Sequence, residues 1–523
     1  MNKPKSVATK ILHNSFWIGV ETITEMIVVT ATSIAVARVL GPELFGHYTA
    51  VFYPMAILQQ LAGAALGVAT CKFMLERLAL GQVELARSVY QYNLRVQVWL
   101  GAVVTLVLIG LVHVFVSPAN RPMGWIIAAS TIPSFFCALG AQANLAHEDT
   151  SKNAWSALAY VFVNAFLIMV SLLRGWGLTG IAVAWTASHA LEAALRIVPL
   201  HFRFRSIPLH PLSGDEKANI RRFAIQALGL QVLTTIVWSR SELLLLSWLS
   251  TSKQVAFYGV ASGLADRLQI APSILGGGLG ISMMAESVRA RDSIDRLVAS
   301  ALRFLSFIAL PICLGAAAVA GAAVSVIYGH RYDPAIPVMR IAALFAIFRA
   351  YLCVPDALLR IGDNQAGLIR CMVLAGIVNM GLDVPLILKW GASGAAVGNG
   401  VGQALGVILI WIVAAKQFSF GISWKVQARF FAAALIPAIS AATIVRLFAN
   451  ITGLCIAITA AVPIYLLCLR LFAAFEPSDV HKLFQISDRL PGALGKFARK
   501  LFSFCVRGQA LPAPADVSSV STG

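Results

Sequence analysis

The stretch WGLTGIAVA at residues 176–184 recurs as WGASGAAVG at residues 390–398, an offset of 214 positions. Two tyrosines in similar surroundings, Tyr48 and Tyr258, lie eight and nine residues after a leucine and are 210 positions apart. An offset of this size that holds at separate points of the chain indicates an internal repeat. The sequence therefore predicts two copies of one structural unit.

Composition indicates what these units are made of. Hydrophobic residues make up 59% of the 523 residues and charged residues 12%, against about 45–50% and about 25% in soluble proteins. So few charges cannot cover a water-soluble surface. The eight cysteines show no CxxC pair and no metal-ligand spacing, so we predict neither a disulfide nor a metal site. The chain is predicted to be an all-α integral membrane protein.

Apolar runs of about 20 residues are long enough to cross a bilayer as helices. The sequence predicts fourteen transmembrane helices, at residues 12–37, 44–67, 97–117, 123–145, 153–173, 178–199, 222–249, 254–285, 304–328, 335–358, 366–388, 392–416, 428–448 and 451–473. The repeat makes these two pseudo-symmetric six-helix lobes followed by two C-terminal helices. Because six is even, both copies would run through the membrane in the same direction.

The predicted domains follow from this count. They are an N-terminal lobe (1–199), a basic cytoplasmic linker (200–221), a C-terminal lobe (222–418), transmembrane helices 13 and 14 (419–474), and a cytoplasmic tail that is amphipathic and then disordered (475–523).

Basic residues outnumber acidic residues by 41 to 23, which gives a net charge of +18. Such a charge could indicate nucleic-acid binding. The lysines and arginines, however, fall mainly in loops and span ends on one side of the membrane, which is the positive-inside pattern. We therefore predict a multi-pass protein of the cell inner membrane with both termini in the cytoplasm and no nucleic-acid partner.

The segment TSIAVARVLGPELFGHY at residues 32–48 resembles the opening hairpin of polysaccharide and O-antigen flippases. These form the polysaccharide transporter branch of the multidrug/oligosaccharidyl-lipid/polysaccharide exporter superfamily. Residues 258–261 and 391–398 are similar to later signatures of that family. The resemblance implies two six-helix lobes arranged in a V. It also implies that the protein is a flippase exporting an undecaprenyl-diphosphate-linked oligosaccharide, an O-antigen or exopolysaccharide repeat unit, by alternating access.

The implied partners are the lipid-linked oligosaccharide, membrane lipids, and the polysaccharide polymerase and glycosyltransferases that handle the same sugar chain. No Walker A sequence and no catalytic constellation is found, and the predicted outer loops are short. We therefore expect neither an enzyme nor a cofactor. Three alternatives stay open: a lipid-linked peptidoglycan precursor flippase, a multidrug exporter of the same superfamily, and a membrane glycosyltransferase or polymerase, which would usually need a large external loop.

Three arginines, Arg240, Arg267 and Arg349, fall well inside predicted spans. Each costs at least about 2.5–3.5 kcal/mol to insert, so each must find a partner or water. A guanidinium offers planar paired donors to phosphate and stays charged at any working pH. We therefore predict that these arginines line a central cavity and bind the diphosphate. The alternative is internal ion pairing, with Asp266 and Asp356 among the candidate partners.

Carboxylates in the spans are the remaining candidates. Glu21 and Glu25 are four residues apart, so they share one face of the first span. They are candidates for coupling an ion or proton to transport. Glu192 and Arg196 have the same spacing in the sixth span and form a candidate gating or structural pair.

Overall fold

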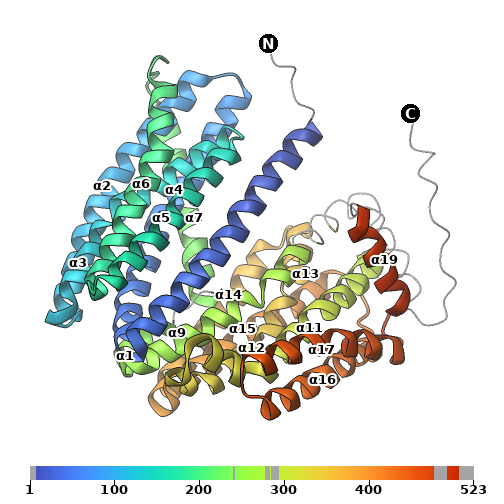
Figure 1. Ribbon diagram of the computed structural model, residues 1–523. Helices are drawn as coiled ribbons and strands as arrows, with labels where there is room; N and C mark the ends of the chain where they lie inside the picture. The colour runs from blue at the N-terminus through green and yellow to red at the C-terminus, as the bar shows by residue number, and fades with distance from the viewer. Residues whose placement is uncertain are drawn as a thin grey trace. The chain divides into compact units, whose positions relative to one another are not determined.

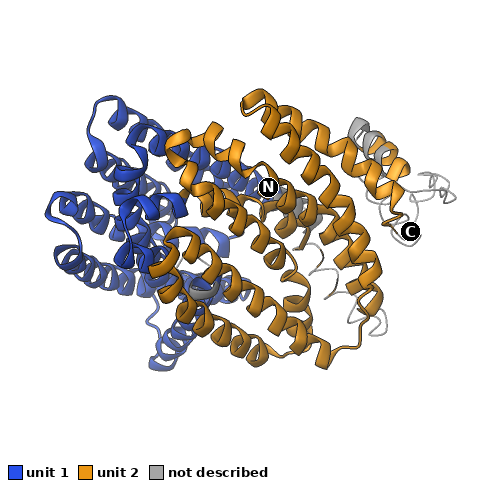
Figure 2. Ribbon diagram, turned by 90° about the horizontal axis from the view of Figure 1, so that it is seen from below, with its two compact units in different colours: residues 1–259 blue, residues 260–523 orange. Residues whose placement is uncertain are grey.

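A computed structural model of the chain describes residues 7–238, 242–276, 279, 283, 294–475 and 492–505. These residues form helices joined by turns and short loops, with no strand among them. The chain divides into two compact units, residues 1–259 and 260–523 (Figures 1 and 2). The predicted all-helical class is confirmed for the described part of the chain.

The first unit contains α1 (Val7–Ala79), α2 (Val83–Phe115), the 3-10 turn η1 (Pro118–Asn120), α3 (Arg121–Ala129), α4 (Thr131–Ala146), α5 (Thr150–Leu173), α6 (Gly177–Phe204), α7 (Gly214–Trp238), α8 (Glu242–Leu249) and the first half of α9 (Ser252–Arg267). The second unit contains the rest of α9, α11 (Ile294–Tyr328), η3 (His330–Ala335), α12 (Ile336–Ala350), α13 (Cys353–Ile361), α14 (Gln365–Trp390), α15 (Ala392–Gln417), α16 (Trp424–Leu447), α17 (Ile451–Leu471) and α19 (Gly492–Cys505).

Eleven helical segments of the described residues are long and apolar enough to cross a membrane. The first, Phe16–Ala79, is kinked at Gly41 and includes most of predicted span 12–37 and all of predicted span 44–67. Predicted spans 222–249 and 254–285 include residues outside the described ones. The multi-pass membrane character is confirmed, whereas the count of fourteen, the lobe arrangement and the domain boundaries stay predictions.

The sequence LGPELFG at residues 40–46 accounts for the kink in α1. Gly41 has φ 73° and ψ 172°, a conformation that a residue with a side chain rarely adopts. Pro42 follows it, and proline is well suited to the first turn of a helix because its missing N–H needs no partner there. A Cβ atom at Gly46 would collide with the backbone carbonyl of Ser252. The motif therefore encodes a bend followed by a close backbone contact.

The repeated tryptophan-glycine motif has the same geometry in both units. Gly177 has φ 57° and Gly391 has φ 56°, and α6 and α15 begin at these turns. A Cβ atom at Gly180 would lie 2.6 Å from the Cβ of Trp176, and one at Gly394 would collide with the carbonyl of Leu386. Both copies thus combine a left-handed turn with a tightly packed helix start.

The predicted linker, residues 200–221, packs on the first unit. Ile220 is buried there in a core with side chains of α1, α2, α4 and α6. Arg77 Nη2 lies 2.6 Å from Glu216 Oε1. The backbone N–H of Ser213, which donates to the Glu216 carboxylate, and the charge of Arg77 hold the pKa of Glu216 below its usual value.

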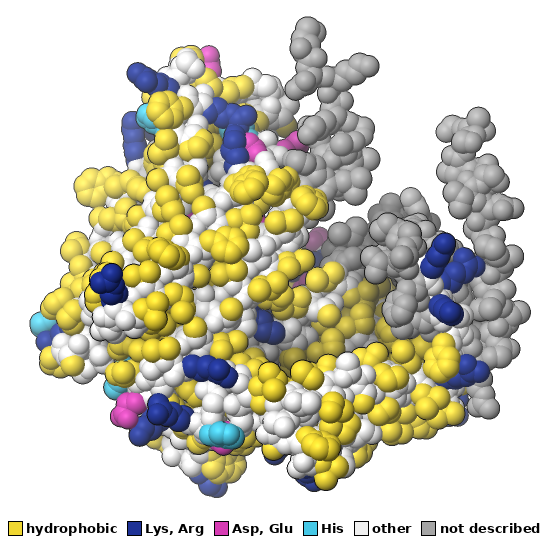
Figure 3. Space-filling view, in the orientation of Figure 1, with side chains coloured by type: hydrophobic (Ala, Val, Ile, Leu, Met, Phe, Trp, Pro, Cys, Tyr) yellow, Lys and Arg dark blue, Asp and Glu magenta, His cyan; other side chains and the backbone are white. Residues whose placement is uncertain are grey.

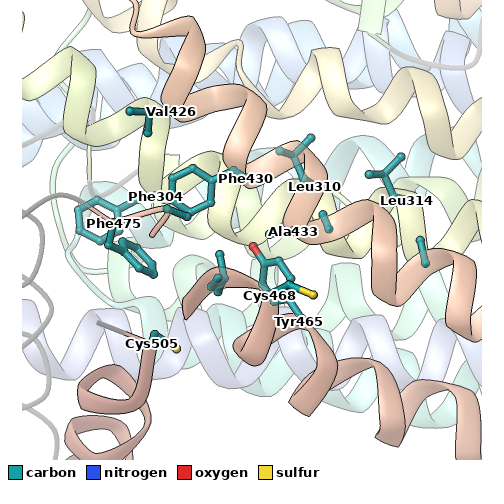
Figure 4. Packing of buried hydrophobic residues seen from close by; sticks show 14 residues of the cluster. Phe304, Leu310, Leu314, Val426, Phe430, Ala433, Tyr465, Cys468, Phe475 and Cys505 are labelled. Atoms are coloured by element: carbon teal, nitrogen blue, oxygen red, sulfur yellow. The ribbon is translucent and has the colours of Figure 1, made fainter. Parts of the chain in front are cut away.

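In the second unit, α16 and α17 pack against α11 and α19 through a buried cluster (Figure 4). Phe430 of α16 is fully buried, and its ring lies 5.4 Å from that of Phe475. Cys505 brings the end of α19 into the same cluster. The cluster fixes the last two predicted transmembrane helices to the preceding bundle.

Candidate functional site

A break in a helix of the second unit holds the first candidate site. Tyr351 and Leu352 separate α12 from α13, within predicted span 335–358. The backbone N–H of Tyr351 donates to the carbonyl of Phe348 at 3.1 Å, so the chain tightens into a 3-10 turn. Pro355 lies in the first turn of α13, where its ring would clash with a helical carbonyl four residues earlier. The proline accounts for the break.

Arg349 lies in the last turn of α12, beside this break. Its Nη1 lies 3.4 Å from Asp266 Oδ1, and the two side chains are 32% and 39% exposed. A guanidinium carries several N–H donors in a fixed fork. A single long contact with Asp266 leaves most of those donors able to reach an anionic ligand.

The other two predicted arginines differ in how they are placed. Arg267 is exposed at the end of α9, next in sequence to Asp266. Arg240 lies outside the described residues. The prediction that these arginines and Arg349 share one cavity therefore stays a prediction.

The first unit has a matching break, between α3 and α4 at Ser130. The amide Nε2 of Gln59 lies 2.9 Å from the carbonyl of Ile127, 3.0 Å from Thr131 Oγ1 and 3.3 Å from Ser130 Oγ. Gln59, Ser130 and Thr131 are all buried. Pro133 stands three residues after Ser130, as Pro355 stands three after the end of the other break.

Gln269 is the counterpart of Gln59 in the second unit. Its Nε2 donates to the carbonyl of Ala346 at 2.7 Å, one turn before the break between α12 and α13. Gln59 and Gln269 are 210 positions apart, the same offset that relates Tyr48 to Tyr258. Each unit thus uses an equivalent glutamine to brace an equivalent broken helix.

Glu192 and Arg196 form a buried ion pair on α6, with Arg196 Nη2 2.6 Å from Glu192 Oε1. Arg196 Nε also donates to Ser156 Oγ at 2.9 Å, and its Nη1 donates to the carbonyl of Cys137 at 3.2 Å. These contacts tie α6 to α5 and α4. Removing one partner of such a pair leaves an uncompensated buried charge, so the pair holds three helices in one arrangement.

Glu21 and Glu25 lie on the first half of α1. Glu21 is half-buried, and its carboxylate is within electrostatic range of Arg196 and Glu25. Glu25 is exposed and interacts electrostatically with Glu192. The phenol of Tyr160 lies in the field of the same carboxylates. The first unit therefore places Glu21 and Glu192 near the fixed Arg196, with Glu25 near both carboxylates.

An apolar groove of about 440 Å³ runs between α11, α16 and α17 in the second unit. Its wall is made largely of small residues, including Gly315, Ala434, Ala438 and Ala457, with Tyr465 at one part of the lining. Small side chains leave room between the helices, and the lining offers almost only apolar contact. The groove suits an extended hydrocarbon chain.

A family model described as polysaccharide biosynthesis protein matches residues 34–337, more than half of the chain. The chain belongs to this family. The match spans the bend at Gly41, the break at Ser130 and all of α11, so the polysaccharide biosynthesis protein family covers most of the first unit and the start of the second. A search of curated proteins found no match to this chain.

Solved structures agree with this assignment at the level of the fold. The lipid II flippase MurJ, in an inward closed conformation, superposes with a TM-score of 0.70 at 13% identity, over 87% of this chain and 98% of MurJ. An inward-facing multidrug resistance MATE family transporter of the MOP superfamily has a TM-score of 0.64 at 14% identity, over 77% of this chain and 97% of its own. The predicted relation to polysaccharide biosynthesis proteins is confirmed by the family match, and the fold is shared with these two solved structures.

Three features of the sites were not predicted. The paired glutamines could have been found from the offset of 210, because Gln59 and Gln269 obey it. The breaks could have been found from Pro133 and Pro355. The contact of Arg196 with Ser156 has no signal in the sequence, since it joins helices that only the fold brings together.

Proposed function

We propose that this protein exports an undecaprenyl-diphosphate-linked oligosaccharide, an O-antigen or exopolysaccharide repeat unit, across the cell inner membrane by alternating access. The family match over residues 34–337 is the observation that carries the proposal. The fold shared with a flippase and with a multidrug resistance transporter supports it. The polysaccharide polymerase and the glycosyltransferases acting on the same sugar chain are proposed partners.

Each part of the substrate has a candidate binding element. Arg349, with donors left over from its contact with Asp266, suits a diphosphate, and Arg267 and Arg240 are proposed to assist. The groove between α11, α16 and α17 suits the prenyl chain, because its lining is almost entirely apolar. These assignments place the anionic and the apolar parts of one lipid in the second unit.

Ion coupling is proposed to reside in the first unit. A charge change at Glu21 or Glu25 would alter the field at the Glu192–Arg196 pair and thereby the tie between α4, α5 and α6. Glu192 and Arg196 would then act as the gating pair. Export by a Glu25→Gln variant should lose its dependence on pH or ion gradient. Export by the variant that matches the unaltered protein at every pH and ion gradient would remove Glu25 from the proposal.

Two alternatives within the superfamily are kept. The fold similarity to MurJ favours a lipid-linked peptidoglycan precursor flippase as the second candidate. A multidrug exporter is less well supported, since arginines in the transmembrane part suit anionic rather than cationic cargo. A membrane glycosyltransferase or polymerase is the least supported, because the solved neighbours are a flippase and transporters.

Deleting the protein from its cell tests the proposal. We expect surface glycan to disappear while lipid-linked repeat units accumulate on the inner face of the membrane. Growth arrest with accumulated peptidoglycan precursor would favour the second candidate. Normal glycan with altered drug sensitivity would favour the multidrug exporter.

A further inference from the structure

Five basic residues gather at one end of the last helices of the second unit. Lys425 and Arg429 lie in the first two turns of α16, Arg470 in the last turn of α17, and Lys496 and Lys500 on α19. The start of α16 and the end of α17 lie together because the two helices pack closely and only three residues join them. We call these five residues the basic cluster. Figure 3 shows lysine and arginine side chains gathered on this part of the molecule.

The described helices that carry the cluster, α16, α17 and α19, contain basic but no acidic residues. No aspartate or glutamate occurs in residues 424–475 or 492–505. Among the described residues, none of the five side chains makes an ion pair with a carboxylate. Lys425, Arg429, Lys496 and Lys500 are exposed. Within the described part of the chain, the positive charge of these side chains is not neutralised by a carboxylate.

Contacts with α16 and α17 hold α19 beside the other helices of the basic cluster. Arg470 Nη1 donates to the carbonyl of Phe504 at 3.4 Å, and its guanidinium carbon lies 5.0 Å from the centre of the Phe504 ring. Cys505 is buried in the hydrophobic cluster that contains Phe475 (Figure 4). Arg429 Nη1 donates to the carbonyl of Ala473 at 3.3 Å. These bonds keep the basic side chains of three helices together.

The position of the cluster indicates the kind of anion. α16 and α17 are membrane-spanning by length and composition, so their ends lie at the level of the lipid headgroups. Trp424, at the start of α16, is 75% exposed, and tryptophan is enriched at the membrane interface. Lys496 and Lys500 share one face of a short basic helix, a pattern typical of helices that lie on anionic membranes.

We propose that the basic cluster binds the headgroup of an anionic phospholipid of the surrounding bilayer. Ammonium and guanidinium groups from α16, α17 and α19 donate to the phosphate, and bound lipid fixes α19 to the end of the transmembrane bundle. This site is distinct from the proposed substrate site at Arg349, and it does not depend on which substrate is exported.

The test uses the purified full chain in nanodiscs of phosphatidylcholine with increasing phosphatidylglycerol. Native mass spectrometry after extraction counts the retained phosphatidylglycerol. We expect Lys496→Gln with Lys500→Gln to weaken retention about fivefold for each cation removed. Lys496→Arg with Lys500→Arg keeps the charge and should retain the lipid.

The control pair is Lys389→Gln with Arg446→Gln, at the ends of α14 and α16 away from the cluster. It should retain phosphatidylglycerol as the unaltered protein does. Equal loss in both glutamine pairs, no loss in either, or loss in the arginine pair would overturn the proposal. Preferential retention of undecaprenyl phosphate over phosphatidylglycerol, abolished by the K496Q/K500Q pair, would also overturn it and assign the cluster to the substrate.

Discussion

An equivalent helix is broken in both units, but the side chains beside the break differ between them. In the first unit, the amide of Gln59 faces the hydroxyls of Ser130 and Thr131, and all three side chains are buried and uncharged. In the second unit, the break lies beside Arg349 and Asp266, whose side chains are 32% and 39% exposed. The glutamine brace is shared, whereas the charge occurs in one copy.

This difference separates architecture from function. A feature that both copies keep, the brace by Gln59 and Gln269, is explained by the need to hold a broken helix. An ion pair in a transmembrane helix carries a desolvation cost that the neutral break avoids. Since the fold is built without charge at one break, the pair at the other needs a further reason. The proposed binding of a ligand by Arg349 supplies one.

The largest expected effect is that of Arg349→Ala on export. Losing a charge-assisted hydrogen bond to the diphosphate should reduce export about 10- to 100-fold. Membrane abundance should not change, because the side chain is partly exposed. Arg267→Ala should act in the same direction. Export is measured in inverted vesicles with a labelled lipid-linked unit, and abundance by immunoblot.

Arg446→Ala is the matched control for these variants, since Arg446 is exposed near the end of α16. It should leave both export and abundance unchanged. If Arg349→Ala and Arg267→Ala both reduce abundance, the arginines hold the fold, and the contrast between the two breaks has no functional meaning.

Gln59→Leu should have the next largest effect, on stability. It removes the buried amide that donates to the carbonyl of Ile127 and contacts both hydroxyls, at a cost of about 1–3 kcal/mol for the bonds lost together. Gln269→Leu should cost less, because Gln269 donates one bond in a partly buried setting. Thermal unfolding midpoints of both variants in one detergent give the comparison. Equal shifts would show that Gln59 and Gln269 contribute equally to stability.

Asp266→Asn tests whether Arg349 acts on the ligand or through its ion pair with Asp266. A partly exposed ion pair is worth at most about 1 kcal/mol, so export should fall no more than about fivefold. Arg349 would keep its charge and its donors to the ligand. A loss of export as severe as that of Arg349→Ala would mean that the ion pair between Asp266 and Arg349 has a structural role.

Much of this fold could be predicted from the sequence, because the membrane limits the choices. Apolar runs mark most helices, and the Gly41 bend and the paired turns at Gly177 and Gly391 follow from a glycine that supplies positive φ. The repeat was predicted from the motif at those turns. The bend at Gly41 falls between the predicted spans 12–37 and 44–67.

The sites could be predicted only in part. Arg349 stands out because a charge inside an apolar run needs compensation. Its contact with Asp266 could not be chosen from the sequence, since several carboxylates were equally good candidates. The link from Arg196 to Ser156 depends on how α5 and α6 pack. Contacts between helices far apart in the chain are set by packing, and spacing along one helix does not reveal them.

Ser130→Ala should have the smallest effect and is the finest test of the neutral break. Ser130 Oγ donates to the Ile127 carbonyl at 2.6 Å and accepts a 3.3 Å contact from Gln59. Gln59 keeps its bonds to Ile127 and Thr131 in the variant, so no buried donor is stranded. We expect a loss of about 0.5–1 kcal/mol, a small drop in the unfolding midpoint, and normal export. A loss of export without a loss of stability would mean that the first break also contacts the cargo, and the division between a structural break and a binding break would fail.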